Sequence, residues 1–334
     1  MRLIVTVDAE ADNQWDHGCP ISTENVLYWQ PFQALCEQYR FVPTYLITSE
    51  IAADRRAVAF LRPLVEAGRA EVGAHLHPWT TPPFQDQPGL RFNDCIHVFP
   101  SQIQRGLLEE KLFTLTTQVA EAVGRLPSSF RAGRFGVNLA CARSLSRLGY
   151  VVDSSVTPLV SWRDHDGLPG AGGGPDFRDH PAKPFLIATG SKAQLLELPV
   201  TILLTNPLLR RCPWLLPVYR ALQVRLGNRL FRWKCLAPQP LWLRPLPEMT
   251  VKRLLVVWRE AKRHSLPAAV MMFHSSELMP GASPYRPTAE SVRQLLALLE
   301  EFFAAVHQDG GEGATLTEAA NSILGQPGLE RRGL

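Results

Sequence analysis

The sequence lacks the features that mark membrane-spanning and exported proteins. No window of its 334 residues approaches the ~18 uninterrupted apolar residues typical of a membrane span. Met1 and Arg2 run directly into "LIVTV", which is too short for the apolar core of a signal peptide and is followed by the acidic "DAEAD". We therefore expect a cytoplasmic protein.

Paired cysteines and a strong net charge are also missing. The six cysteines are scattered without a CxxC pair, which is typical of a reduced protein whose cysteines are small buried apolar residues. A formal net charge of +4 gives no reason to expect nucleic acid as a partner. Because 46% of the residues are apolar, the chain can bury a large core, as two domains or as one α/β barrel.

What the sequence does contain is an alternation of strand and helix patterns. Short apolar runs predict strands, and amphipathic stretches predict helices between them. This alternation predicts an α/β fold with a parallel sheet, in which ligands bind beyond the carboxyl ends of the strands. The predicted strands are 2–7, 42–48, 70–75, 128–133, 150–155, a proline-interrupted stretch near 194–204, and 268–273; the predicted helices are 24–38, 53–68, 101–124, 137–149, 250–264 and 288–308.

Ionisable residues stand at the ends of several predicted strands. Each one alone is compatible with an ordinary surface residue. In a parallel sheet, however, these strand ends converge, so together the residues predict one site. They are Asp8 and Glu10, His75 and His77, Arg131, Asp153, and His274 with Glu277 beyond it.

Two of these groups have a spacing suited to a metal site. In "TVDAEADNQW", Asp8, Glu10 and Asp12 alternate, so an extended chain would place three carboxylates on one face, where a cation or protons must offset them. In "GAHLHPW", His75 and His77 are also two residues apart and could bind zinc or a similar ion, with the prolines holding the corner. The alternative for the three carboxylates is a solvated acidic loop. The alternative for the two histidines is that one is functional and the other only packs in the core.

Five motifs in order resemble those of the polysaccharide deacetylase family, the NodB-homology or carbohydrate esterase 4 group. They are Asp8 with Glu10, "GAHLHPW", "FRAGRFG", "VVDSSV" and "MMFHSSE". The resemblance spans about residues 1–310 and is strongest to the WalW-like branch, associated with lipopolysaccharide biosynthesis. It implies a distorted (β/α)7 barrel of the NodB-homology and glycoside hydrolase-deacetylase type. It also implies a metal-dependent hydrolase that removes an N-acetyl group from a saccharide of a surface-polysaccharide pathway.

The resemblance also implies roles for individual residues. Asp8 falls on the general base and Arg131 on the arginine that orients it. Asp153 falls on the fourth-motif aspartate, which would orient Arg131 or His274, and His274 falls on the general acid. An ordinary buried ion pair is the alternative for Arg131 and Asp153.

The implied metal site departs from the family pattern at one position. Glu10 and His75 fall on metal ligands, with zinc favoured over cobalt, nickel and manganese. The family's second histidine usually stands four residues after the first, where this chain has Trp79. We therefore expect His77 as the third ligand, with Asp12 or water as alternatives.

Two inserts interrupt the pattern expected for a single barrel domain over 1–334. Residues 156–190 form a long Pro/Gly-rich connection that could cover the site as a lid. The second insert, about 206–246, lies in a stretch (198–247) without an acidic residue and interleaves arginines with aromatic residues. Its part 217–234 has helical spacing, which suits packing on the barrel or contact with an anionic membrane beside a lipid-linked sugar.

Two other functions stay open at this point. The same barrel could hydrolyse another non-peptide C–N bond, such as a cyclic amide. Alternatively, it could bind a glycan or a partner protein without catalysis, a reading that the departure at Trp79 favours. The oligomeric state cannot be inferred from the sequence.

Overall fold

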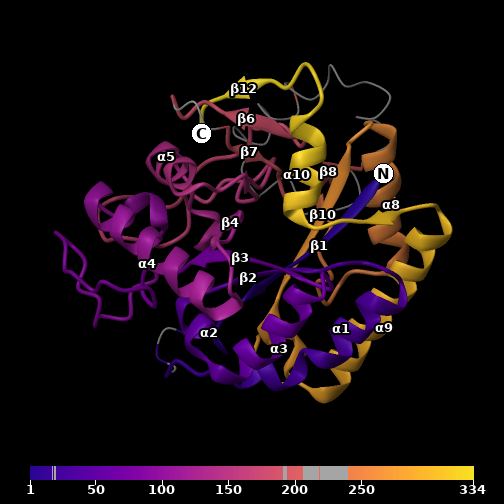
Figure 1. Cartoon of the computed structure of the whole chain (residues 1–334), viewed down its shortest axis with the longest axis horizontal. Helices are drawn as coiled ribbons and strands as arrows, with labels where there is room; N and C mark the ends of the chain where they lie inside the picture. Colours follow the sequence, from indigo (N-terminus) through magenta and orange to yellow (C-terminus); the bar gives the residue numbers. More distant parts are fainter. Residues whose placement is uncertain (17, 19, 191–193, 206–217, 219–239) are drawn as a thin grey trace.

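The fold is built around one curled, mostly parallel β-sheet with helices on its outside (Figure 1). The structure is a computed structural model that describes residues 1–16, 18, 20–190, 194–205, 218 and 240–334. Most of the expected basic-aromatic insert, including its predicted helix, therefore lies outside the described residues. No helix in the described part is long and apolar enough to cross a membrane.

The sheet has the strand order β10-β1-β2-β3-β4-β5-β7-β6-β12, with β11 added beside β1. The pairs from β10 through β5 to β7 are parallel, whereas β6 runs antiparallel to β7. The strands are β1 (Arg2–Ala9), β2 (Thr44–Ile47), β3 (Glu71–Leu76), β4 (Ser129–Ala132), β5 (Val152–Asp153), β6 (Phe185–Ile187), β7 (Leu196–Glu197), β10 (Ala268–His274), β11 (Glu312–Gly313) and β12 (Arg331–Arg332). A separate hairpin pairs β8 (Ile202–Leu204) with β9 (Pro240–Trp242).

The curled sheet closes only partly, which confirms the expected distorted barrel. Between β10 and the β7 side the strands form no continuous ladder, and single hydrogen bonds bridge the gap. Thr201 N donates to Val270 O at 3.1 Å, and Met272 N donates to Leu243 O at 3.3 Å. Residues on both sides of the opening thus satisfy their backbone groups without a regular strand pair.

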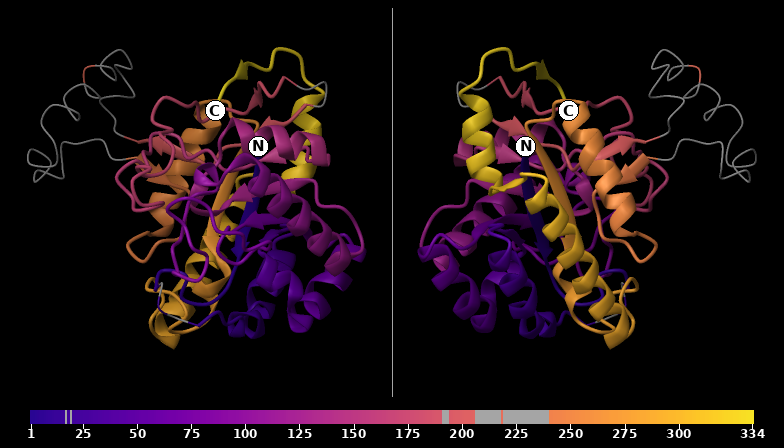
Figure 2. Two further views of the ribbon diagram at one scale, coloured as in Figure 1. Left: turned by 90° about the vertical axis from the view of Figure 1, so that its left-hand side faces the viewer. Right: turned by 90° about the vertical axis from the view of Figure 1, so that its right-hand side faces the viewer.

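The helices cover the outside of the sheet, and α8 and α9 run side by side along it (Figure 2). Glycines in the left-handed conformation end two of them, with φ 80° at Gly124 and 88° at Gly149. The α-helices are α1 (Gln30–Gln38), α2 (Ser49–Ala53), α3 (Arg55–Glu66), α4 (Arg105–Val123), α5 (Leu139–Leu148), α8 (Val251–Arg263), α9 (Ala289–Gln308) and α10 (Leu316–Leu324), and the 3-10 turns are η1 (Glu24–Tyr28), η2 (Pro100–Gln102), η3 (Gly133–Phe135) and η5 (Ser275–Leu278).

Two predicted helices differ from the structure, and one helix was not predicted. The helix expected over 24–38 divides into η1 and α1, with Pro31 in the first turn of α1. The helix expected over 53–68 is preceded by the short α2, because Asp54 adopts an extended conformation and caps α3. The pattern also gave no sign of α10, whose buried face packs on β1 and β5.

Strands β1 and β10 form the centre of the core. Leu3 to Ala9 are all buried, as are Ala268 to Phe273, because helices cover one face of these strands and the barrel interior covers the other. The carboxyl ends of both strands, Asp8 and His274, are register partners. The two longest strands of the sheet therefore deliver ionisable side chains to one place.

Candidate active site and metal centre

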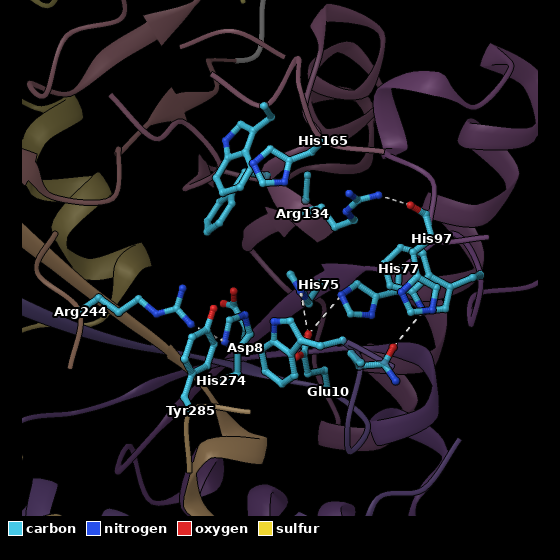
Figure 3. A pocket seen from close by; sticks show the side chains of 16 residues that line it. Asp8, Glu10, His75, His77, His97, Arg134, His165, Arg244, His274 and Tyr285 are labelled. Atoms are coloured by element: carbon cyan, nitrogen blue, oxygen red, sulfur yellow. Dashed lines mark hydrogen bonds and ion pairs between the residues drawn. The ribbon is translucent and has the colours of Figure 1, made fainter. Parts of the chain in front are cut away.

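A pocket of about 330 Å³ opens at the carboxyl ends of the strands (Figure 3). This is the position that the parallel sheet predicts for a ligand site, and the volume suits a small ligand. Side chains from β1, β3 and β10 meet there with residues of the loops that follow β1, β3, β4 and β5. Of the predicted site residues, Asp8, Glu10, His75, His77 and His274 line the pocket.

Asp8 is held by a buried guanidinium, as the sequence predicted. Arg131, fully buried on β4, donates from Nη1 to Asp8 Oδ1 at 2.5 Å and to Thr6 Oγ1 at 2.9 Å. Its Nε donates to the Ser154 carbonyl at 2.8 Å, which fixes the direction of the side chain. Burial by itself would raise the pKa of Asp8, but Arg131, His75 and His274 outweigh it, and the pKa lies below its ordinary value. Asp8 is therefore a carboxylate at neutral pH.

Glu10, His75 and His77 converge on one point beside Asp8. Their ligand atoms all lie within 4.8 Å of one another. Glu10 Oε2 is 3.8 Å from His75 Nε2 and 3.3 Å from His77 Nε2, and all three side chains are buried. Gly133 permits this approach, because a Cβ at that position would lie 2.5 Å from His77 Cδ2.

The electrostatics of this cluster favour a cation. Burial lowers the pKa of His75 to about 4 and that of His77 well below its ordinary value, so both rings are neutral near pH 7. Burial, together with the charges of Asp8 and Glu50, raises the pKa of Glu10 well above its ordinary value. Two neutral imidazoles and a carboxyl group that needs a counter-charge form a donor set suited to a divalent metal.

The residues around the cluster fix the orientation of both rings. His75 Nδ1 donates to the Arg131 carbonyl at 2.9 Å, so Nε2 carries the lone pair toward Glu10. Trp79, at the position of the family's usual second histidine, stacks on His77 with centroids 4.2 Å apart. Its indole N–H donates to Gln14 Oε1 at 2.9 Å. Trp79 therefore packs the His77 ring in place.

Asp12, the alternative third ligand, is used in another way. Its two oxygens accept four hydrogen bonds, from Ser22 Oγ, the backbone N–H of Glu24, and both the backbone N–H and the side-chain amide of Asn25. These bonds tie the loop after β1 to η1. The Asp12 carboxylate thus holds the loop in its conformation. It does not belong to the metal-type cluster, which consists of Glu10, His75 and His77.

His274 has different neighbours from those expected. Its Nδ1 lies 3.3 Å from Glu277 Oε1 and 3.1 Å from Arg244 Nη2, and Arg244 also donates to Glu277 at 3.2 Å. Trp15 meets the ring edge-on with centroids 5.1 Å apart. Glu277, which we expected at the strand end beyond His274, thus contacts the His274 ring directly, whereas no pattern in the sequence singled out Arg244 within the second insert.

Asp153 has other hydrogen-bond partners than the Arg131 or His274 expected for it. It makes no hydrogen bond to Arg131 or His274, and it does not line the pocket. Instead Asp153 Oδ1 accepts from Ser155 Oγ at 2.5 Å, and its register partner on β7 is Glu197. Burial raises the pKa of Asp153 to about 6 and the pKa of Glu197 well above its ordinary value, so the two carboxyl groups retain at least one proton between them. The chain turns Asp153 away from the pocket at the position where β5 pairs with β7.

The long connection after β5 reaches the pocket. Trp162 and His165 line it, and Phe135 stacks on Trp162 with centroids 5.2 Å apart. His180 is half-buried against the rings of Phe177 and Phe185. The connection thus supplies part of the wall of the site.

The comparisons with known proteins identify the fold. No family model and no curated protein matches the sequence. Among solved structures, the chain is similar to a protein from Mycobacterium smegmatis assigned as a polysaccharide deacetylase, at a TM-score of 0.53 and 15% identity over 100% of this chain and 94% of that one. It is also similar to PuuE allantoinase, at a TM-score of 0.52 and 12% identity over 96% of this chain and 88% of that one. A third similar structure is 4-alpha-glucanotransferase from Thermococcus litoralis, at a TM-score of 0.54 and 12% identity over 99% of this chain and 42% of that one.

The fold is that of the polysaccharide deacetylase-type barrels. At identities this low the likeness establishes the shared fold alone. The same architecture appears under three different enzyme names, so the function of this chain has to be argued from its own site.

Proposed function

We propose that this protein is a metal-dependent hydrolase that removes an N-acetyl group from a sugar. One observation carries the proposal: a charged carboxylate, Asp8, and a histidine, His274, stand as neighbours beside the cluster of Glu10, His75 and His77. A base, an acid and a metal-type cluster in one pocket are the groups that amide hydrolysis requires. A barrel that only binds a glycan or a partner would need neither the base nor the acid.

The residues of the cluster fit a divalent ion. His75 Nε2 presents a lone pair to Glu10 Oε2, since the other ring nitrogen is committed to the Arg131 carbonyl. Two acceptors that face each other in a buried site are stable only with a cation or a proton between them. Glu10, His75 and His77 would hold the ion, and zinc suits a set of two nitrogens and one oxygen. When bound, the ion supplies Lewis acidity toward an amide carbonyl and lowers the pKa of a water molecule.

The protein's own groups would move the protons. Asp8 Oδ1 is occupied by Arg131, which leaves Oδ2 to accept a proton from the attacking water. Nδ1 of His274 faces Glu277 Oε1 and would donate to it when the ring is protonated, which leaves Nε2 to protonate the leaving amine. Glu277 and Arg244 act as positioning residues that hold the imidazole ring toward the pocket.

The biological setting is a further part of the proposal. The motif resemblance to the WalW-like branch supports a substrate from surface-polysaccharide or lipopolysaccharide biosynthesis. The absence of acidic residues between 198 and 247 supports contact with an anionic membrane surface near a lipid-linked sugar. Binding of the purified protein to vesicles of anionic lipid tests the second point, and the absence of any affinity would remove it.

The experiment that tests the function measures metal content and acetate release together. Elemental mass spectrometry of the purified protein should find about one zinc or similar ion per chain, and that ion should be lost in Glu10→Ala, His75→Ala and His77→Ala. Asp8→Asn should retain the ion and lose acetate release from N-acetylated oligosaccharides by about 100-fold or more. The exposed Asp94→Asn is the matched control. A protein that binds no metal after incubation with zinc or cobalt would refute the proposal.

A second candidate activity is the hydrolysis of another non-peptide C–N bond. The similarity to PuuE allantoinase over 96% of this chain favours keeping it. A panel that pairs N-acetylated sugars with cyclic amides decides between the two. Both activities would use the metal-type cluster together with Asp8 as base and His274 as acid. Activity on cyclic amides alone would therefore revise the proposed substrate and leave the proposed mechanism in place.

A further inference from the structure

The pocket holds one cation whose charge is not matched by a neighbouring carboxylate. Among the described residues that contact the pocket, Arg244 pairs with Glu277, and Asp8 pairs with Arg131 behind it. Arg134, which follows β4 in the turn η3, has no carboxylate oxygen of a described residue within 4.0 Å of its guanidinium. Its hydrogen bond goes to the backbone carbonyl of His97, and its guanidinium carbon lies 4.0 Å from the centre of the Phe99 ring.

The backbone holds Arg134 in a left-handed conformation that is unfavourable for a residue with a side chain. Arg134 has φ 52° and the next residue, Phe135, has φ 58°, both in the left-handed region. A residue with a side chain costs about 1 kcal/mol or more there, and glycine would remove that cost. The turn therefore keeps an arginine at a position where backbone geometry favours glycine.

The surroundings of Arg134 are suited to a sugar that carries an anionic group. Figure 3 shows the guanidinium between His165 and His97, across the pocket from Arg244 and Tyr285. Phe135 and Trp162, stacked at 23°, form an apolar wall next to it. A planar apolar wall suits the apolar face of a sugar ring, and a guanidinium that lines the pocket suits a carboxylate or a phosphate.

Burial adds to the preference for an anion. Burial lowers the pKa of Arg134, and Asp166 only opposes this shift from a distance. An anion bound to the guanidinium would compensate a half-buried charge that no carboxylate of the described residues pairs with. The same anion would meet no repulsion from Asp8, because Arg131 already neutralises that carboxylate.

We propose that Arg134 binds an anionic group of the substrate, so that the preferred substrate is an N-acetylated sugar bearing a carboxylate or a phosphate. This inference rests on the proposed function for the acetylated sugar, and it adds the charge of that sugar. Arg134 is a specificity-determining residue in this view. It does not take part in proton transfer.

The test compares the binding of neutral and anionic sugars by isothermal titration calorimetry with the full-length protein. The probes are N-acetylglucosamine, its 1-phosphate and 6-phosphate, and N-acetylglucosaminuronic acid. Each is measured with metal-free and zinc-loaded protein, because phosphate can also bind a metal. We expect at least one anionic probe to bind about tenfold or more tightly than the neutral sugar in both preparations. The phosphate and uronate arms identify which anion is preferred.

Variants connect this preference to Arg134. Arg134→Gln should reduce the tenfold preference to about onefold, and Arg134→Lys should retain part of it, because lysine keeps the charge without the planar fork. Arg125→Gln, an exposed arginine just after α4, should leave the preference unchanged. Thermal unfolding checks that each variant is folded.

Either of two results overturns the inference. One is equal binding of neutral and anionic sugars, or no binding of any of them, by the wild-type protein. The other is a preference that survives in Arg134→Gln. A preference that depends on Arg134, in a protein that releases no acetate from any probe, would support the inference on the anion and refute the proposed hydrolysis.

Discussion

Lys111 offers the sharpest test of how the chain positions its metal-type cluster. It is fully buried on α4, and its ammonium group donates three hydrogen bonds to the segment just after His77. The acceptors are the carbonyls of Pro78 at 2.9 Å, Thr81 at 2.5 Å and Pro83 at 2.8 Å. The three N–H donors of the ammonium group thus match three carbonyl acceptors of this segment. The prolines of the segment have no backbone N–H groups with which to form a regular strand pair.

Lys111→Met keeps the volume of the side chain and removes the ammonium group. Each carbonyl left without a partner costs about 1 to 3 kcal/mol, and entering water recovers part of this, so we expect a loss of about 3 to 5 kcal/mol in the free energy of unfolding. Because the segment carries His77 at its start, we also expect the affinity for cobalt to fall about tenfold or more. Urea denaturation and titration of the visible Co²⁺ spectrum measure the two effects.

The matched control is Lys252→Met, which removes an exposed lysine from α8 and should change neither quantity. If Lys111→Met fails to fold, Lys111→Gln provides the second measurement, since its amide restores two donors and should recover part of the stability. A free energy of unfolding within about 1 kcal/mol of wild type, together with unchanged cobalt affinity, would refute the reasoning.

Three further predictions address other parts of the site. Glu197→Gln should make the protein more stable than wild type in urea titrations, by a margin that grows from pH 5 to pH 8. The folded chain holds protons on Asp153 and Glu197 up to about pH 6 or higher, so the stability of the wild type falls as the pH rises through that range. A margin independent of pH would contradict the retained proton. Gly133→Ala should displace His77 and weaken Co²⁺ binding about tenfold at unchanged helix content by circular dichroism, because the new Cβ would lie 2.5 Å from the imidazole ring. Asp12→Ala should lower the melting temperature by several degrees and leave metal stoichiometry at the wild-type value, whereas loss of the ion would restore Asp12 as a ligand.

Many of the strands and helices were predictable from the sequence, because they depend on local patterns. Apolar runs marked the long strands β1, β3 and β10, and Gly149 marked the end of α5, since period and turn residues act over a few positions. The two-residue spacing of His75 and His77 was also readable, and the structure brings both rings to Glu10. Short elements such as β6, β11 and β12 escaped prediction, because strands of two or three residues carry no periodic signal.

Other features of the site were decided only by tertiary structure. The sequence placed Asp153 beside Arg131 or His274, but pairing of β5 with β7 turns its carboxyl group toward Glu197. Arg244 reaches His274 from a segment 30 residues away, and no local pattern distinguishes it from the other arginines of that region. Arg134 has a left-handed backbone and no carboxylate partner among the described residues, and only the three-dimensional structure reveals both features.

The sequence by itself therefore determined which residue types stand at the strand ends, because strand length and side-chain alternation are local properties of the chain. The tertiary structure decided which of those residues meet, through strand order, the curl of the sheet and the loops that return to the pocket. Contacts between residues far apart in the chain depend on the packing of the whole core, and that packing leaves no signature in any single stretch of the sequence.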